Sequence, residues 1–339
     1  RAQQAARSAR HQEVLSLAGE LLEQVSAGAS PRSGDMLGEL HFLRADALRH
    51  LGRWAESEAA VGAVTTFEDS EVAVGRAQRA WRLRSELARR GRQWDVALAA
   101  AAEAERGALA RRDEVGAALA AVSAARVLSD MGRGSEADPV YERVLAQAEA
   151  QLDGDDPAWA LVMVATRTAA SLAQFRGDDP RGALAALEAI RPLLARVDHA
   201  ITCAAYWRQV AILLELGRRY SSAVRTLNRA LDLYDRVRYE PGRYDVYWSL
   251  SRSYIELGDL RTARLCLREC VVVAERLALR VELGKSKSSF ADLAVREGRY
   301  DEAMELYGED LALSRDQGDQ QALGHCTRKL AYCHHLMAH

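Results

Sequence analysis

Seven glycines recur at nearly equal intervals along this chain of 339 residues. The gaps between them are 39, 41, 45, 40, 41 and 40 residues. Most are followed within three positions by an aromatic residue or leucine. A fixed period of this size indicates a solenoid, in which each repeat buries its apolar face only against its neighbours. The glycines are Gly52, Gly91, Gly132, Gly177, Gly217, Gly258 and Gly298.

The segments between the glycines have the pattern of helix pairs. Apolar residues between Tyr247 and Leu257 recur at spacings of three and four, and the same spacing resumes from Ala263. Gly258 lies between them, where a helix commonly ends in a left-handed residue. Two Asp-Asp-Pro triplets, which end at Pro157 and Pro180, predict helix starts, because proline suits the first turn. Pro192 is expected to kink or shorten the helix over 181–197.

The pattern predicts an all-α fold with three parts. Residues 1–35 form a leading helix and a loop, 36–318 form seven helix pairs, and 319–339 form a closing helix. The chain begins at Arg1 without a methionine, so we expect a segment of a longer protein. Its arginine-rich, lysine-poor composition is a hint of a bacterial source.

Composition narrows the classes of function. The formal net charge is -2 and no basic run is present, so direct nucleic-acid binding is not expected. No apolar stretch is long enough to span a membrane, and a cytoplasmic location is expected. The five cysteines have no framework spacing and are expected to be reduced, buried thiols. We expect no enzyme, cofactor or metal site, because every glycine is isolated at a turn and no CxxC pair occurs.

The turns resemble those of the tetratricopeptide repeat family. The phrases at 257–263 (Leu-Gly-Asp-Leu-Arg-Thr-Ala) and 297–303 (Glu-Gly-Arg-Tyr-Asp-Glu-Ala) carry the resemblance best. An alanine follows the glycine by five or six residues in six units, and Ser57 replaces it in the first. The period of about 41 exceeds the family's 34. Long repeats of this kind are similar to those of bacterial peptide receptors and of activator sensor arms. HEAT and armadillo arrays have a comparable period but lack this turn.

The resemblance implies a right-handed superhelical solenoid whose first helices line a concave face. Residues ten and six positions before each glycine should then point inward, with a possible shift of one at Gly217 that selects Arg208. The closing helix would add two residues by analogy. The predicted ligand-binding set is Phe42, Asp46, Trp81, Arg126, Arg167, Trp207, Arg208, Trp248, Arg252, Asp292, Arg328 and Tyr332.

Tryptophan and arginine dominate this set. Arginine forms a planar fork that suits carboxylates, and tryptophan offers a broad apolar face. The pattern favours a non-catalytic scaffold for a peptide or protein partner, as a regulatory or sensor module of a larger bacterial signalling protein. The alternative is that these residues only pack or are solvated, on an arm that spaces or oligomerises other domains. Two further interpretations are a sensor arm for a small-molecule inducer and a regulatory arm of a separate protease, kinase or nucleotide switch.

Overall fold

The structure is a computed structural model that describes residues 2–27, 33–50, 53–64, 71–152, 156–176, 179–277, 279–316 and 320–337. Within these ranges the chain is helical apart from its turns, and no strand is present. The chain divides into two compact units, Arg1–Tyr206 and Trp207–His339, whose boundary falls inside α10 (Ala200–Leu216). None of the helices in the described ranges is long and apolar enough to cross a bilayer.

The first unit contains nine α-helices before α10, as far as the structure describes it. They are α1 (Ala2–Ala27), α2 (Ser33–His50), α3 (Trp54–Val64), α4 (Glu71–Arg90), α5 (Trp94–Ala110), α6 (Glu114–Asp130), α7 (Gly134–Gln151), α8 (Pro157–Arg176) and α9 (Pro180–Ile190). A 3₁₀ segment, η1, follows at Arg191–Arg196. It begins one residue before Pro192, whose missing N–H cannot continue the α-helical ladder. The expected shortening of this helix is therefore confirmed.

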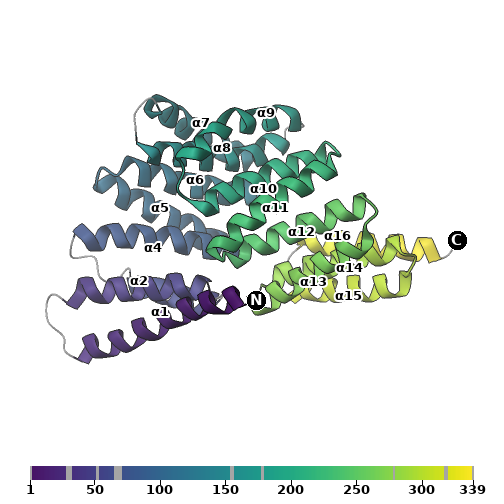
Figure 1. The fold of residues 1–339 in the computed structure, drawn as a ribbon, viewed down its shortest axis with the longest axis horizontal. Coiled ribbons are helices and arrows are strands. Elements are labelled where there is room, and N and C mark those ends of the chain that lie inside the picture. Colours follow the sequence, from purple (N-terminus) through teal and green to yellow (C-terminus); the bar gives the residue numbers. More distant parts are fainter. Residues whose placement is uncertain are drawn as a thin grey trace. The chain divides into compact units, whose positions relative to one another are not determined.

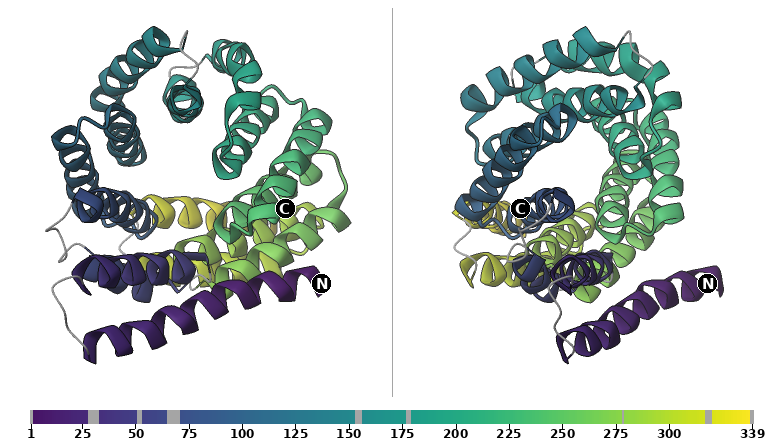
Figure 2. Two further views of the ribbon diagram at one scale, coloured as in Figure 1. Left: turned by 60° about the vertical axis from the view of Figure 1, so that its left-hand side comes forward. Right: turned by 90° about the vertical axis from the view of Figure 1, so that its left-hand side faces the viewer.

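The second unit continues the same alternation after α10. Its helices are α11 (Tyr220–Val237), α12 (Glu240–Glu256), α13 (Leu260–Arg276), α14 (Arg280–Arg296), α15 (Tyr300–Asp316) and α16 (Gln320–Met337). Consecutive helices within each unit run antiparallel (Figure 1), and Figure 2 shows the pairs from two further directions. The all-α solenoid of helix pairs is confirmed, whereas the three-part domain division stays a prediction.

One turn geometry recurs between helices. A residue in the left-handed conformation stands two positions before the next helix, with φ between 54° and 82°. The N–H of the following residue then bonds to the carbonyl five positions earlier, at 2.8 to 3.0 Å. This is the Schellman motif, which satisfies carbonyls that the helix end leaves open. The left-handed residues are Arg92, Arg112, Gly132, Arg218, Arg238, Gly258 and Gly298.

The turn glycines do not all hold the left-handed position. Gly132, Gly258 and Gly298 do, as the sequence predicts for Gly258. At Gly91 and Gly217 the arginine that follows holds it instead, at φ 56° and 55°. This conformation costs an L-residue roughly 1–2 kcal/mol, so the turn bond forms there in spite of backbone strain at the arginine. Gly52 and Gly177 lie outside the described residues.

The left-handed residue of each turn also determines which residue of the second helix is buried. In every pair with a described left-handed residue, an alanine stands five positions after it and is completely buried. Alanine lets helix backbones approach closely. In the first pair Ser57 takes this place, and its hydroxyl donates to the carbonyl of Ala45 at 2.7 Å. The alanines are Ala97, Ala137, Ala223, Ala263 and Ala303.

Four of the five cysteines are buried, which confirms the prediction for most of the thiols. All five are free. The Cys326 thiol donates to Asp310 at 2.9 Å, and Cys333 packs in a cluster with Ala291, Ala303 and Tyr307. Cys203 is half-buried. Within the described ranges, no group of three or more His, Cys, Asp and Glu side chains is placed to hold a metal ion.

Replacing Gly258 by valine should lower the free energy of unfolding by about 1–2 kcal/mol or more, because a β-branched residue is poorly tolerated at φ 81°. Urea unfolding followed by circular dichroism measures the change. Gly308→Ala is the matched control, since the added methyl enters open space inside α15 and should raise stability by about 1 kcal/mol. Equal stability of Gly258→Val and the wild type would contradict the proposed role of this turn.

Candidate ligand-binding face

Several first helices of successive pairs contact one another, whereas the second helices do not make comparable contacts within the described ranges. In the first unit α2 touches α4, α4 touches α6, and α6 touches α8. In the second unit α12 touches α14. A row of helices that lie closer together than their partners forms the inner side of a curved stack. Each unit therefore has an inner side made of first helices.

The inner row is defined here by two residues on each first helix. They stand twelve and eight positions before the start of the second helix, and their spacing of four places them on one helix face. In the first unit the row is Phe42, Asp46, Arg82, Glu86, Val122, Arg126 and Thr168; its second position on α8, Leu172, lies outside the side chains that the structure describes. In the second unit it is Arg208, Ile212, Trp248, Arg252, Ser288 and Asp292.

Seven of the sequence-predicted residues belong to this row: Phe42, Asp46, Arg126, Arg208, Trp248, Arg252 and Asp292. Trp81, Trp207 and Arg167 stand one residue before it, because counting from Gly91, Gly177 and Gly217 starts one position early. The alternative register at Gly217 selects Arg208, which stands in the row as defined here. Arg82 was missed. The signal was in the sequence, since the buried alanine follows these three glycines by six residues and the others by five.

The displaced residues contact their surroundings in other ways. The Arg84 guanidinium lies over the Trp81 ring, 5.2 Å from its centroid. Arg229 of α11 lies 5.1 Å from the centroid of Trp207. Arg167 pairs with Glu149 of α7 at 3.2 Å. Trp207 and Arg167 thus reach toward second helices.

In the first unit, the inner row is basic on α4. Arg79 lies over the ring of Phe42, 4.9 Å from its centroid. Arg82 is half-buried, and the part of the chain that the structure describes offers no hydrogen-bond or ion-pair partner to its guanidinium. Burial lowers the pKa of His199, and Arg82 and Arg49 lower it further. Positive charge is therefore concentrated where Arg82 and Arg49 lie close to His199.

The neighbouring carboxylate on α4, that of Glu86, is bound by arginines of the same helix. Glu86 accepts hydrogen bonds from Arg89 at 3.0 Å and from Arg90 at 3.0 Å. Burial alone would raise the pKa of Glu86, but Arg89, Arg90 and the exposed Arg126 hold it far below its usual range. Glu86 is thus ionised and engaged by its own arginines. It does not neutralise Arg82.

In the second unit, Trp248 and Arg252 form a stacked pair on α12. The guanidinium lies 5.1 Å from the ring centroid, within the range of a cation–π contact. The indole N–H donates to Ser289 of α14 at 3.0 Å, which fixes the ring across the two first helices. Trp248 is half-buried and the Arg252 side chain is 47% exposed. The pair offers a rigid apolar face with a cation at its edge.

A buried carboxylate lies behind this pair. Glu215 of α10 accepts a hydrogen bond from Ser253 at 2.6 Å, and its second oxygen is 4.0 Å from Arg252. Burial raises the pKa of Glu215, and the Ser253 hydrogen bond, Arg252 and Arg208 only partly offset it. At 4.0 Å the attraction leaves most of the Arg252 donors available to a ligand.

The remaining predicted residues lie on α14 and α16. Asp292 accepts hydrogen bonds from the Tyr307 hydroxyl and from Lys329 at 2.6 Å, so its charge is neutralised within the unit. Arg328 is exposed and lies 3.2 Å from the ring nitrogen of His325. Tyr332 is exposed as well. A role for Arg328 and Tyr332 in binding stays a prediction.

Comparisons with known proteins fit this geometry. Models of the tetratricopeptide repeat match residues 120–154, 244–274 and 289–321. These stretches cover most of the pairs α6–α7, α12–α13 and α14–α15. No curated protein matches the sequence.

Solved structures share the fold at low sequence identity. A Rap protein complexed with competence and sporulation factor is 12% identical with a TM-score of 0.57, and the match covers 97% of this chain and 99% of that one. A signal transduction ATPase with a tetratricopeptide repeat sensor, from Pyrococcus horikoshii, has the same identity and TM-score over 96% of this chain and 50% of that one. BtubC from P. vanneervenii is 15% identical with a TM-score of 0.52, over 67% and 92%.

The stability that Glu215 contributes should depend on pH. Its pKa is raised above the ordinary value of 4.5, so the folded chain binds this proton more tightly than the unfolded chain. The stability that protonated Glu215 contributes is fully present below pH 4.5. It is lost as the pH rises through the pKa that Glu215 has in the folded chain. Glu215→Gln should therefore gain stability relative to the wild type between about pH 4 and 7, as measured by urea unfolding. The exposed Glu305→Gln is the control, and an equal gain there would refute the assignment.

Proposed function

We propose that this chain, which is built from tetratricopeptide repeats, is a non-catalytic scaffold that holds a peptide segment along the inner row. The segment carries a carboxylate and at least one large apolar side chain. The Trp248–Arg252 pair carries the proposal, because its ring is already fixed by Ser289 and its guanidinium is largely exposed. Ordering this site before binding lowers the entropic cost of association.

The first unit supports the same chemistry. Arg82 holds a positive charge on the inner row and has no hydrogen-bonded or ion-paired carboxylate among the described residues; Asp113 acts on it only at longer range. An arginine that is partly withdrawn from water gains more from a bound carboxylate than an exposed one does, because the local dielectric is lower. Each unit thus has its own point for an acidic group.

Catalysis is not part of the proposed role. The titratable groups of the inner row are engaged in structural pairs: Asp46 with Arg49 at 2.7 Å, Glu86 with Arg89, and Asp292 with Lys329. A general base must be free to accept a proton from a substrate. We propose that the scaffold serves in bacterial signalling in the cytoplasm, in line with the fold similarity to a Rap protein that was solved with a bound factor.

A second candidate function is a sensor arm that binds a small inducer. The similarity to the sensor-bearing signal transduction ATPase favours it, and this chain spans half of that protein. Such an arm would regulate a catalytic or switch domain outside the present segment. Peptide selection separates the two functions, because a small-molecule sensor would enrich no peptide on the inner row.

Random peptides displayed on phage and selected on the protein should converge on sequences with an acidic group and large apolar residues. A synthetic copy, measured by fluorescence polarisation, should bind the Trp248→Ala/Arg252→Ala variant about thirtyfold more weakly, because hot-spot residues contribute about 2 kcal/mol or more.

The matched control is Leu265→Ala/Arg268→Ala, which removes an exposed apolar residue and an exposed arginine from α13. It should leave affinity unchanged, and circular dichroism should show that both variants keep the fold. Equal affinity of all three proteins, or no enriched peptide at all, would refute the inner-row proposal.

A further inference from the structure

A concavity lies between α1 and α2, and none of its lining residues belongs to the inner row. It has a volume of about 400 Å³, within the usual range for small-molecule sites. Ala18 and Leu22 of α1 pack against Leu40 of α2, whereas Leu15 packs toward the core beneath α2, α3 and α4. Gly19 lies between these contacts, and a Cβ added there would meet no atom within 4 Å. The missing side chain leaves the hollow open.

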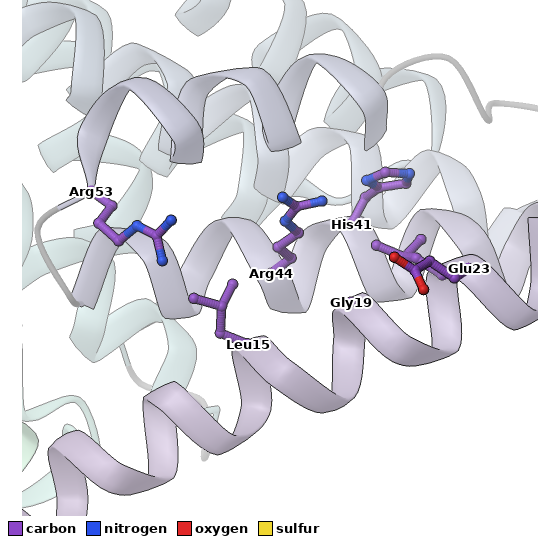
Figure 3. A pocket seen from close by; sticks show the side chains of 7 residues that line it. Leu15, Gly19, Glu23, His41, Arg44 and Arg53 are labelled. Carbon is purple, nitrogen blue, oxygen red and sulfur yellow. The ribbon is translucent and has the colours of Figure 1, made fainter.

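The lining has an apolar side and a basic side. Leu15, Gly19 and Leu22 come from α1. Figure 3 shows Arg44 and His41 rising from α2 in the same direction, while Arg53 reaches in from the turn before α3. Glu23 lies on α1 at the end of the cavity near His41. An amphipathic molecule would match both sides.

The charges of the lining favour an anion. Arg53 is held by Glu56 through two hydrogen bonds of 2.6 and 2.5 Å, so its charge is already compensated. Arg44 is half-buried, and the described part of the chain places no hydrogen-bond or ion-pair partner on its guanidinium; Glu56 is near enough to interact with its charge, but Arg44 makes the smallest contribution to lowering the pKa of Glu56. Glu23 is exposed and can turn into solvent. A partly desolvated guanidinium without a hydrogen-bonded partner can accept a carboxylate or phosphate as its ligand.

We propose that this cavity binds a small amphipathic organic anion, with its charged group on Arg44 and its apolar part against Leu15 and Leu22. The site uses no residue of the inner row, so it is independent of the peptide-binding proposal. Because α1 contacts α2, a ligand here would tie the leading helix to the first pair. The ligand would then stabilise the packing of α1.

The probes are octanoate, octyl phosphate, octanol and octylamine, each titrated into the full chain by isothermal calorimetry. We expect saturable binding of at least one of the two anions, and much weaker binding of octanol and octylamine. The stronger of the two anions identifies the preferred head group, carboxylate or phosphate. Equal binding of all four probes, or of none, would overturn the proposal.

Three variants locate the site. Arg44→Gln should weaken binding of the preferred anion by about tenfold or more, through loss of the charge-assisted bonds. Gly19→Leu should abolish binding by filling the hollow, while it raises thermal stability because leucine is the better helix former. Glu23→Gln should strengthen binding modestly, since a like charge is removed. Weaker binding to Glu23→Gln would indicate a cationic or zwitterionic ligand and refute the proposal.

The control for fold and for the other site is Arg268→Gln on α13, which should leave anion binding unchanged. Peptide binding to the Trp248–Arg252 pair should survive in Gly19→Leu and Arg44→Gln. Retention of octanoate and octyl phosphate binding in both cavity variants would show that the anion binds elsewhere.

Discussion

The whole array depends on the backbone bond that closes each turn. The N–H after each described left-handed residue bonds to the carbonyl five positions earlier, from Gln93 in the first unit to Arg299 in the second. Because this turn has a constant length, it determines where the next helix starts and which of its residues face inward. The fully buried alanine and the inner row both lie at constant distances from it. Once the turn is set, the neighbouring helices have little freedom to rotate.

The paired-helix architecture could be predicted because it rests on periodicity, which is a property of the sequence itself. The glycine spacing, the alanine that follows and Pro192 just after the ninth helix each correspond to a feature of the structure. Helix starts at Pro157 and Pro180 were equally predictable, since proline and the aspartates before them satisfy the first turn; Asp179, for example, accepts from the N–H of Gly182.

The register of the inner row was harder to predict. Glycine is the residue expected in the left-handed conformation, but at Gly91 and Gly217 an arginine holds that conformation despite its Cβ. Local preference is overridden there by the closing bond and by the buried alanine. Pairing of charges was only partly readable from the sequence. Glu86 pairs with Arg89 three residues further along the same helix, whereas Asp292 is neutralised by Lys329, which only the packing of helices brings near. The hollow at Gly19 was missed, since a helical glycine leaves no periodic signal.

The buried position that follows each turn has a wider consequence. It is occupied by alanine in most pairs and by serine at Ser57, so the gap between two helix axes is set by a side chain of one or two heavy atoms. Exchange among glycine, alanine, serine and cysteine at a single such site would change the separation of one helix pair by a fraction of an ångström and leave the other pairs as they were. Curvature can thus be adjusted locally during evolution or by design, one repeat at a time, while the side chains that meet the partner stay the same.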